Sequence, residues 1–431
     1  MAYNLECAEN LDLENLGLSE KIKADTRRNR MSAVSVLVKD EEGNAVEGAK
    51  IDIKQTKSAF KFGCNAFIAT QLPEKEQEKY DECFKKLFNQ AVVPFYWHDD
   101  EPEEEVYRFK SGSPYIYRRP PADDVLLWCE KLGIEPKAHN MIWLNPVIGL
   151  PAWMPKDKTK LQKKLDDRIK MLSELYADKI PSWDVTNEVA AAGNYEDMPE
   201  DYEVRAHKLA GELFPDNHLI YNDYHGFYNQ TYHGKRTNTY QIIKKILACG
   251  GRIDGIGIQH HMFGKREGWE KDNDMLSAKH ILNMLNLYSG LGKALHMSEI
   301  TIPSFDSSEE LLNAQAKIVE NLYRIWFSRE KMESIVYWNM ADGFAHVTPN
   351  TTWNENYYGG GLVHHNFEQK PAYEVLDKLI NHEWHTEISG ETGKGGAFSA
   401  EMYHGDYTIT ANGKSFDRKV DKNTDIIEIQ L

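Results

Sequence analysis

The sequence predicts a (β/α)8 TIM barrel with a small accessory β-sandwich-like module built by the two ends of the chain. Between residues 60 and 385, short apolar segments alternate eight times with amphipathic segments, and this alternation is typical of a TIM barrel. Residues 35–56 and 387–431 instead alternate apolar and polar residues between Gly, Asn and Asp turns, as surface strands do. A doubly wound open sheet is the alternative, but no G-x-G-x-x-G motif follows the first strand.

The eight predicted strands are short and rich in apolar or β-branched residues, as buried parallel strands are. They are FKFGCNAF from Phe60, FNQAVVPFYW from Phe88, EPKAHNMIW from Glu135, PSWDVTNE from Pro181, HLIYNDY from His218, RIDGIGIQHHM from Arg252, ALHMSEITI from Ala294 and SIVYWNMAD from Ser334. Each precedes a segment whose apolar residues recur every three or four positions, the period of a helix. These segments lie around Phe84–Phe88, Val125–Leu132, 159–176, Val204–Leu213, Ile242–Leu247, Ile281–Leu287, Leu311–Trp326 and Tyr373–Ile380.

The chain accordingly divides into an N-terminal β segment (1–57), a catalytic barrel (58–386) and a C-terminal β segment (387–431). In the first segment, the turn D-E-E-G-N separates two alternating stretches. We expect the two terminal segments to pack together and to cap the barrel rather than bind sugar, because neither shows a cluster of exposed aromatic residues.

Composition excludes several classes of function. The 431 residues include 67 acidic and 51 basic side chains, for a net charge of −16, and 41% of the residues are hydrophobic. This balance excludes intrinsic disorder and argues against a nucleic-acid partner or an anionic membrane surface. The five cysteines are scattered without a C-x-x-C pair, so we expect free thiols, no metal and no cofactor.

The N-terminal residues are polar and acidic, and they include neither a basic region nor an apolar leader. No stretch of 18 apolar residues occurs. The sequence as written therefore predicts a cytoplasmic protein. A secreted protein whose leader had been removed would show the same sequence. The oligomeric state is not determined by these features.

Polar side chains gather where the predicted barrel strands end, which is where TIM barrels build their active sites. Glu188 and Glu299 end the fourth and seventh strands, on opposite sides of the barrel mouth. Enzymes that hydrolyse glycosides typically use two carboxyl groups that face each other across the bond to be cleaved. A short gap between them gives retention of configuration and a longer gap gives inversion. The other strand-end residues are His139, Trp143, Asn187, Asn222, Asp223, Gln259, His261 and Trp338.

Several of these segments resemble glycoside hydrolase family 10, the family best known for endo-β-1,4-xylanases. WDVTNEVA, which contains Glu188, resembles the acid/base signature of the family, and HMSEITIP, which contains Glu299, resembles its nucleophile strand. KAHNMIW and GIGIQHHM resemble the segments of its third and sixth strands, and IYNDYHGF and HNFEQKPAY are also similar. The resemblance covers roughly residues 60 to 380, in the family's order.

The resemblance implies a retaining β-glycoside hydrolase that cleaves β-1,4-xylosidic bonds in xylan or xylo-oligosaccharides by a double displacement. Glu188 would be the acid/base and Glu299 the nucleophile. Asn187 would bind the sugar 2-hydroxyl, His261 would orient Glu299, and Trp338 would form the floor under the sugar ring. The full set of implied substrate-binding residues is His139, Trp143, Asn187, Gln259, His261, Trp338 and Asn222.

The sequence also departs from the family pattern beside the cleavage point. The polar E-N-x-x-K grip after the second strand is replaced by VPFYWHDDEP (Val93–Pro102), so we expect an apolar surface from Pro94, Phe95, Tyr96 and Trp97. Trp143 is followed by Leu144 rather than His, and His346 stands where a second Trp is expected. An exo-acting or aglycone-directed β-glycosidase is therefore one alternative. A non-catalytic carbohydrate-binding barrel is an alternative of another class.

Two further features are predicted to be structural. His260–His261 and His364–His365 are adjacent pairs, and neighbouring residues on a strand point to opposite faces, so neither pair is expected to bind a metal. The acidic run Asp99–Glu105 is expected to be a solvated loop.

Overall fold

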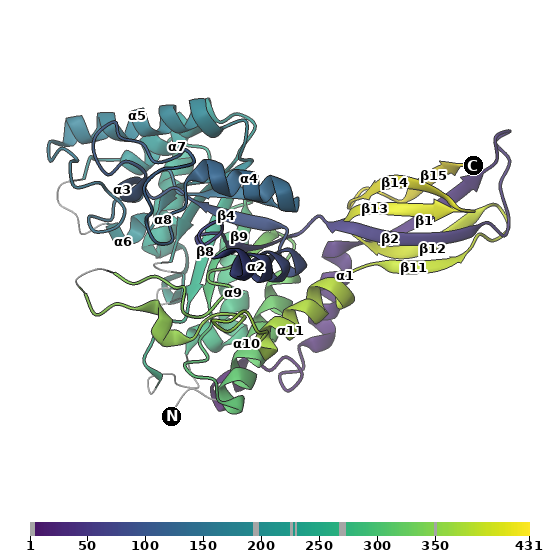
Figure 1. Cartoon of the computed structure of the whole chain (residues 1–431). Helices are drawn as coiled ribbons and strands as arrows, with labels where there is room; N and C mark the ends of the chain where they lie inside the picture. Colours follow the sequence, from purple (N-terminus) through teal and green to yellow (C-terminus); the bar gives the residue numbers. More distant parts are fainter. Residues whose placement is uncertain (1–4, 193–197, 225–226, 229–230, 267–272, 349–350) are drawn as a thin grey trace.

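Eight parallel strands form a closed barrel in the computed structural model, which describes residues 5–192, 198–224, 227–228, 231–266, 273–348 and 351–431 (Figure 1). The strands follow one another around the barrel in chain order, and the last one closes on the first. The predicted TIM barrel is therefore confirmed. Its strands are β3 (Lys61–Asn65), β4 (Gln90–Pro94), β5 (Glu135–His139), β6 (Ser182–Asn187), β7 (His218–Asp223), β8 (Gly255–His261), β9 (Ala294–Thr301) and β10 (Met332–Tyr337).

Helices cover the outside of the barrel and bury the apolar stripe that each predicted segment carries. In α5, Leu161, Leu165, Ile169 and Leu172 are buried, and Asp157 caps the first turn by accepting a hydrogen bond from the backbone N–H of Lys160 at 2.9 Å. No helix among the described residues is long and apolar enough to cross a membrane. The main helices are α2 (Glu74–Leu87), α4 (Ala122–Leu132), α5 (Lys158–Tyr176), α7 (Tyr202–Leu213), α8 (Asn238–Ala248), α9 (Ala278–Ser289), α10 (Glu309–Phe327) and α11 (Pro371–Asp377).

The two ends of the chain build one β module that projects from the barrel (Figure 1). One sheet has the order β12-β1-β15 and the other has the order β11-β2-β13-β14. Buried residues such as Val36, Ile53 and Ile409 form the core between the sheets. The predicted accessory module is therefore confirmed. Its strands are β1 (Met31–Lys39), β2 (Lys50–Ser58), β11 (Glu387–Glu391), β12 (Ala397–Tyr403), β13 (Gly405–Ala411), β14 (Lys414–Val420) and β15 (Ile426–Gln430).

The first two strands of the module lie in different sheets, although only residues 40–49 join them. β1 pairs with β12 and β15, whereas β2 pairs with β11 and β13. A bridge between Lys39 and Ala45 closes the turn, but the strands then diverge into opposite sheets. Alternation of apolar and polar residues shows that one face of a strand is buried. It does not show whether the next strand pairs beside it or packs across the core.

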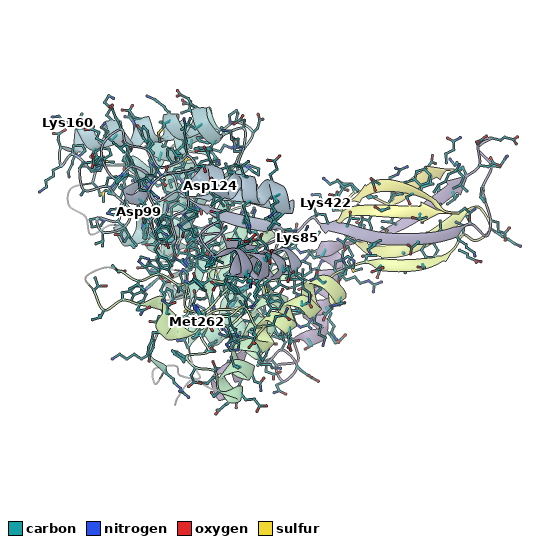
Figure 2. The ribbon with its side chains drawn as sticks, in the orientation of Figure 1. Lys85, Asp99, Asp124, Lys160, Met262 and Lys422 are labelled. Carbon is teal, nitrogen blue, oxygen red and sulfur yellow. The ribbon has the colours of Figure 1, made fainter. Side chains whose placement is uncertain are left out.

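The junction between module and barrel begins with two helical segments that the alternation in the sequence did not indicate. These are η1 (Leu5–Leu11) and α1 (Ser19–Arg30), which precede β1. Arg30 ends α1 and donates hydrogen bonds to the carbonyl oxygens of Phe327 and Met332, both at 2.7 Å. Its guanidinium also lies 4.7 Å from the centre of the Phe60 ring. Lys422 marks the end of the module that faces this junction (Figure 2).

Candidate active site

A cavity of about 730 Å³ opens at the carboxyl ends of the barrel strands. Strand-end side chains converge there because all eight strands run in the same direction. Asn222 is the one predicted site residue that does not line the cavity. The predicted residues that do line it are His139, Trp143, Asn187, Glu188, Gln259, His261, Glu299 and Trp338.

Both carboxylate oxygens of Glu299, which lies near the end of β9, are held by neighbouring side chains. Asn222 Nδ2 donates to Glu299 Oε1 at 2.7 Å, and His261 Nε2 lies 3.2 Å from Oε2. The other ring nitrogen of His261 lies 2.9 Å from Thr301 Oγ1, which orients the imidazole. The Glu299 carboxylate is therefore fixed in the cavity wall before any substrate enters.

Glu188 follows β6 directly and has a left-handed backbone with a φ of 54°. Its carboxyl group accepts hydrogen bonds from Trp143 Nε1 at 3.1 Å and from Gln259 Nε2 at 3.4 Å. Burial, together with the negative charges of Glu299 and Asp223, raises the pKa of Glu188 to about 8. Glu188 is therefore mostly protonated at pH 7. The site thus holds a carboxylic acid that can donate a proton.

Asn222 lies beneath the cavity and connects the two halves of the site. Its Nδ2 donates both to Glu299 and to Asn187 Oδ1, the latter at 2.9 Å, while its Oδ1 accepts a hydrogen bond from Ser298. Gln259 Nε2 also donates to Asn187 Oδ1, at 3.2 Å. These bonds fix the orientation of the Asn187 amide, whose NH₂ has no hydrogen-bond partner among the described residues. Asn222 itself is fully buried and acts through its neighbours.

The glycine at position 257 in β8 makes room for this network. A Cβ at Gly257 would lie 2.4 Å from Asn222 Oδ1, which no side-chain carbon tolerates. We expect Gly257→Ala to displace Asn222 and lower kcat/KM by roughly 10- to 100-fold, because a catalytic group shifted by about 1 Å loses that much. The measurement is steady-state kinetics, with Gly393→Ala as the control, since its Cβ would meet nothing closer than 3.9 Å. An active Gly257→Ala enzyme would contradict this role.

Aromatic rings form the floor beneath the glutamates. His139 lies 5.3 Å from Trp338 and 5.5 Å from Tyr96 between ring centres, edge to face in both pairs. His139 Nδ1 lies 2.8 Å from the fully buried Asp184, which Lys137 also contacts. Burial alone would raise the pKa of Asp184, but Lys137 and His139 hold it below its usual value. The ionised Asp184 in turn fixes the orientation of the His139 ring.

The family model for glycosyl hydrolase family 10 matches residues 53–378. The chain belongs to glycosyl hydrolase family 10. It is 25% identical over 331 residues to endo-1,4-beta-xylanase A of Caldicellulosiruptor saccharolyticus, covering 70% of this chain and 86% of that protein. It is also 25% identical over 405 residues to the anti-sigma-I factor RsgI6 of Acetivibrio thermocellus, covering 92% of this chain and 46% of that protein.

Solved structures agree with this assignment. The structure of xylanase 10B from Thermotoga petrophila in complex with xylobiose is similar with a TM-score of 0.58 and 25% identity, covering 75% of this chain and 95% of that one. Native xylanase 10B from Thermotoga maritima gives the same TM-score and identity. The protein is thus a family 10 glycoside hydrolase similar to endo-1,4-β-xylanases, and the predicted resemblance is confirmed.

The family 10 chain departs from expectation at the end of β4, where an apolar surface was predicted from Pro94, Phe95, Tyr96 and Trp97. Tyr96 lines the cavity, but its neighbours turn into the protein. Phe95 packs against Trp183 with ring centres 5.0 Å apart, and Trp97 donates to Glu101 at 2.8 Å. The prediction of an apolar surface is wrong for Phe95 and Trp97, because Phe95 is buried before the short helix α3 (Trp97–Asp100) begins and the first turn of α3 buries Trp97.

The acidic run Asp99–Glu105 is also only partly the solvated loop that we predicted. Asp99 accepts a hydrogen bond from Arg119 Nε at 2.9 Å. Asp100 pairs at 2.9 Å with the fully buried guanidinium of Arg168. These two carboxylates therefore anchor the loop between β4 and α4, whereas the glutamates at 103–105 remain exposed. Charge alone did not reveal which acidic residues have cationic partners.

Several residues that line the cavity were not predicted, because they lie in loops after the strands rather than at strand ends. Phe263 stacks on His261 with ring centres 4.6 Å apart, and Trp353 meets the edge of Phe263 at 5.2 Å. Their aromatic character is the only signal that the sequence offers for them. The unpredicted residues are Arg118, Arg119, Asn145, Ile148, Tyr224, Tyr228, Phe263, Gly264, Asn273, Met275, Thr348, Trp353 and Glu355.

Among the described residues, the one group with the geometry of a metal site lies away from this cavity. His218, His296 and Glu333 place one ligand atom each within 4.8 Å of one another. They belong to the amino-terminal parts of β7, β9 and β10, at the end of the barrel opposite the glutamates. His296 also contacts Ser334 at 2.8 Å. A metal bound there would stabilise the barrel but would not reach the substrate.

Proposed function

We propose that this family 10 glycoside hydrolase is a retaining, endo-acting enzyme that cleaves β-1,4-xylosidic bonds in xylan or xylo-oligosaccharides. The observation that carries the proposal is the unequal pair of carboxyl groups. Glu188 has a pKa raised to about 8 and is protonated at pH 7, whereas Glu299 accepts hydrogen bonds at both oxygens. A proton donor and a fixed nucleophile in one cavity are what a double displacement requires.

In the first step, Glu299 attacks the anomeric carbon while Glu188 gives its proton to the departing glycosidic oxygen. The products are a covalent glycosyl ester on Glu299 and the released sugar, whose former glycosidic oxygen is now a hydroxyl group. Burial still raises the pKa of Glu188, but the ester removes the negative charge of Glu299 that also raised it, so the pKa falls and Glu188 now acts as a base. It takes a proton from a water that attacks the anomeric carbon from the opposite face to Glu299, and two inversions give net retention.

Other side chains in the cavity position the sugar for these steps. Asn187, whose oxygen is held by Asn222 and Gln259, presents its NH₂ to the 2-hydroxyl of the sugar at the cleavage point. This hydrogen bond strengthens as positive charge develops on the ring in the transition state. Trp338 and His139 supply the aromatic surface against which the ring lies.

Product lengths from xylohexaose labelled at its reducing end test the endo-acting part of the proposal. We expect labelled xylobiose and xylotriose early in the reaction, because the cavity is open and cleavage begins inside the chain. A Glu299→Ala protein should give no products. Release of xylose alone from one end would contradict endo action, and no cleavage of xylohexaose would contradict xylan as the substrate.

A further inference from the structure

Two adjacent arginines, Arg118 and Arg119, form part of the cavity wall and are here called the arginine pair. They lie in the loop between α3 and α4, beyond the segment Val93–Pro102 that replaces the family's polar E-N-x-x-K grip. Their exposed fractions are only 3% and 6%. Burial of two like charges side by side is costly unless partners offset it. The protein groups that contact each guanidinium therefore show whether either positive charge remains available to an anionic ligand.

Among the described residues, only one carboxylate forms an ion pair with the arginine pair. Arg119 Nε donates to Asp99 at 2.9 Å, but no carboxylate in the described part of the chain lies within 4.0 Å of Arg118. The acceptors of Arg118 are neutral: Asn339 Oδ1 at 2.7 Å and the carbonyl oxygen of Phe344. Among the described residues, no hydrogen-bond partner engages Nη2 of either arginine.

The arginine pair is held rigidly before any ligand arrives. Arg118 has a left-handed backbone with a φ of 62°, a conformation that costs a non-glycine residue energy. Its N–H donates to Gln71 Oε1 at 2.9 Å, and Gln71 in turn donates to the carbonyl of Ile116 at 2.8 Å. The guanidinium of Arg119 lies 3.6 Å from the centre of the Tyr96 ring. Such preorganisation favours binding over a merely structural role.

A chain of contacts places the arginine pair about one sugar ring from the cleavage point. Tyr96, on which Arg119 stacks, lies 5.5 Å from His139, and His139 Nδ1 lies 3.9 Å from Glu299 Oε1. Glu188, which protonates the departing sugar, follows β6. The residues that anchor the pair, Gln71, Asp99 and Asn339, follow β3, β4 and β10, and β10 lies directly across the barrel from β6. The arginine pair therefore faces the part of the substrate that the enzyme retains.

We propose that the arginine pair binds a carboxylate of the substrate, so that the preferred glycan carries a uronic acid beside the sugar at the cleavage point. Planar guanidinium groups match a carboxylate through two parallel N–H donors. Glu355 also lines the cavity, and its negative charge partly offsets the effect of burial on the pKa of Arg118, but no oxygen of Glu355 lies within 4.0 Å of either guanidinium. The inference rests on the proposed glycosidase activity and adds a substrate class to it.

Three 4-nitrophenyl glycosides with one leaving group test this inference. The first is the β-xylobioside, and the second is the same disaccharide with a glucuronic acid branch on its distal xylose. The third has glucuronic acid itself as the distal sugar. Each acidic compound is compared with its carboxyl-reduced counterpart, which is neutral and of nearly the same shape. We expect one acidic compound to exceed its reduced form in kcat/KM by about ten-fold or more, because a charge-assisted hydrogen bond contributes that much.

The variants separate charge recognition from disruption of the loop. Arg118→Gln should bring the ratio of acidic to reduced substrate towards one, and Arg118→Lys should keep part of it. Lys110→Gln is the matched control, because Lys110 is an exposed cation in the same loop and does not line the cavity. It should leave the ratio unchanged.

The outcomes distinguish this inference from the proposed function. Cleavage of the plain xylobioside without preference for either acidic compound would overturn the inference and leave the glycosidase standing. A preference in the branched or in the linear compound would support it and would identify where the uronic acid lies. If no compound is cleaved, titration calorimetry with Glu299→Gln protein measures the affinity for each acidic compound and for its reduced form. Equal affinity for the acidic and reduced forms would then overturn the inference.

Discussion

Glu299→Ala is expected to lower kcat/KM for xylo-oligosaccharides on the order of 10⁴-fold or more, because the covalent step has no substitute nucleophile. The neighbouring groups that hold Glu299, Asn222 and His261, remain in place in this variant. The melting temperature should therefore change little compared with the loss of activity. Steady-state kinetics with xylotetraose, alongside thermal unfolding, measures both quantities.

Azide provides the second measurement on Glu299→Ala. The missing side chain leaves space for a small anion on the face of the sugar that Glu299 normally attacks. With an aryl xylobioside, azide should therefore give the α-glycosyl azide, of inverted configuration. A β-glycosyl azide, or activity close to that of the unmodified enzyme, would show that Glu299 is not the nucleophile.

Glu188→Gln is expected to have an effect that depends on the leaving group. For xylo-oligosaccharides the loss should be about 10²- to 10⁴-fold, because the departing hydroxyl needs a proton. For a dinitrophenyl xylobioside, glycosylation needs no proton and should remain fast. Hydrolysis of the ester then lacks its base, so one equivalent of phenol should appear in a burst. An equal loss for both substrates would contradict the role of Glu188 as the acid.

The pH dependence of the enzyme should follow from the same residue. With the pKa of Glu188 raised to about 8, kcat/KM should fall as the pH rises through about 8, when the acid loses its proton. The folded protein also retains a proton between pH 4.5 and about 8 that the unfolded chain releases, so Glu188 lowers stability as the pH rises through this window. Glu188→Gln should therefore be more stable at pH 8, by roughly 1–3 kcal/mol, and not below pH 4.5. Denaturant unfolding at both pH values measures this difference.

The site residues at the strand ends were predictable because, in a TIM barrel, the carboxyl ends of all the strands lie at the same end of the barrel. Once eight strands are recognised, Glu188 and Glu299 must both lie at the mouth of the barrel. Their immediate neighbours on the strands follow for the same reason. The role of Asn222 could not be predicted in the same way. Its position at a strand end does not show whether its side chain binds the sugar or is buried and holds neighbouring side chains in place. Only the hydrogen bonds to Glu299 and Asn187 separate the two.

The arginine pair was not predictable, because its position depends on contacts between distant parts of the chain. The backbone of Arg118 is bound by Gln71, and its guanidinium by Asn339. Neither contact has a sequence pattern, since loops lack the periodicity that identifies strands and helices. The same limit explains the divergence of β1 and β2, where alternation identified the strands but not the sheet that each one joins.

Proton NMR of the first product formed from xylohexaose tests the central claim most directly, namely that Glu188 and Glu299 carry out a double displacement. The spectrum is recorded within minutes, before mutarotation mixes the anomers, and a Glu299→Ala protein serves as the control. The proposed mechanism predicts that the new reducing end appears first as the β-anomer and only later as the α-anomer. Initial α-anomer would show a single inverting displacement by water and would contradict the assignment of Glu299 as nucleophile.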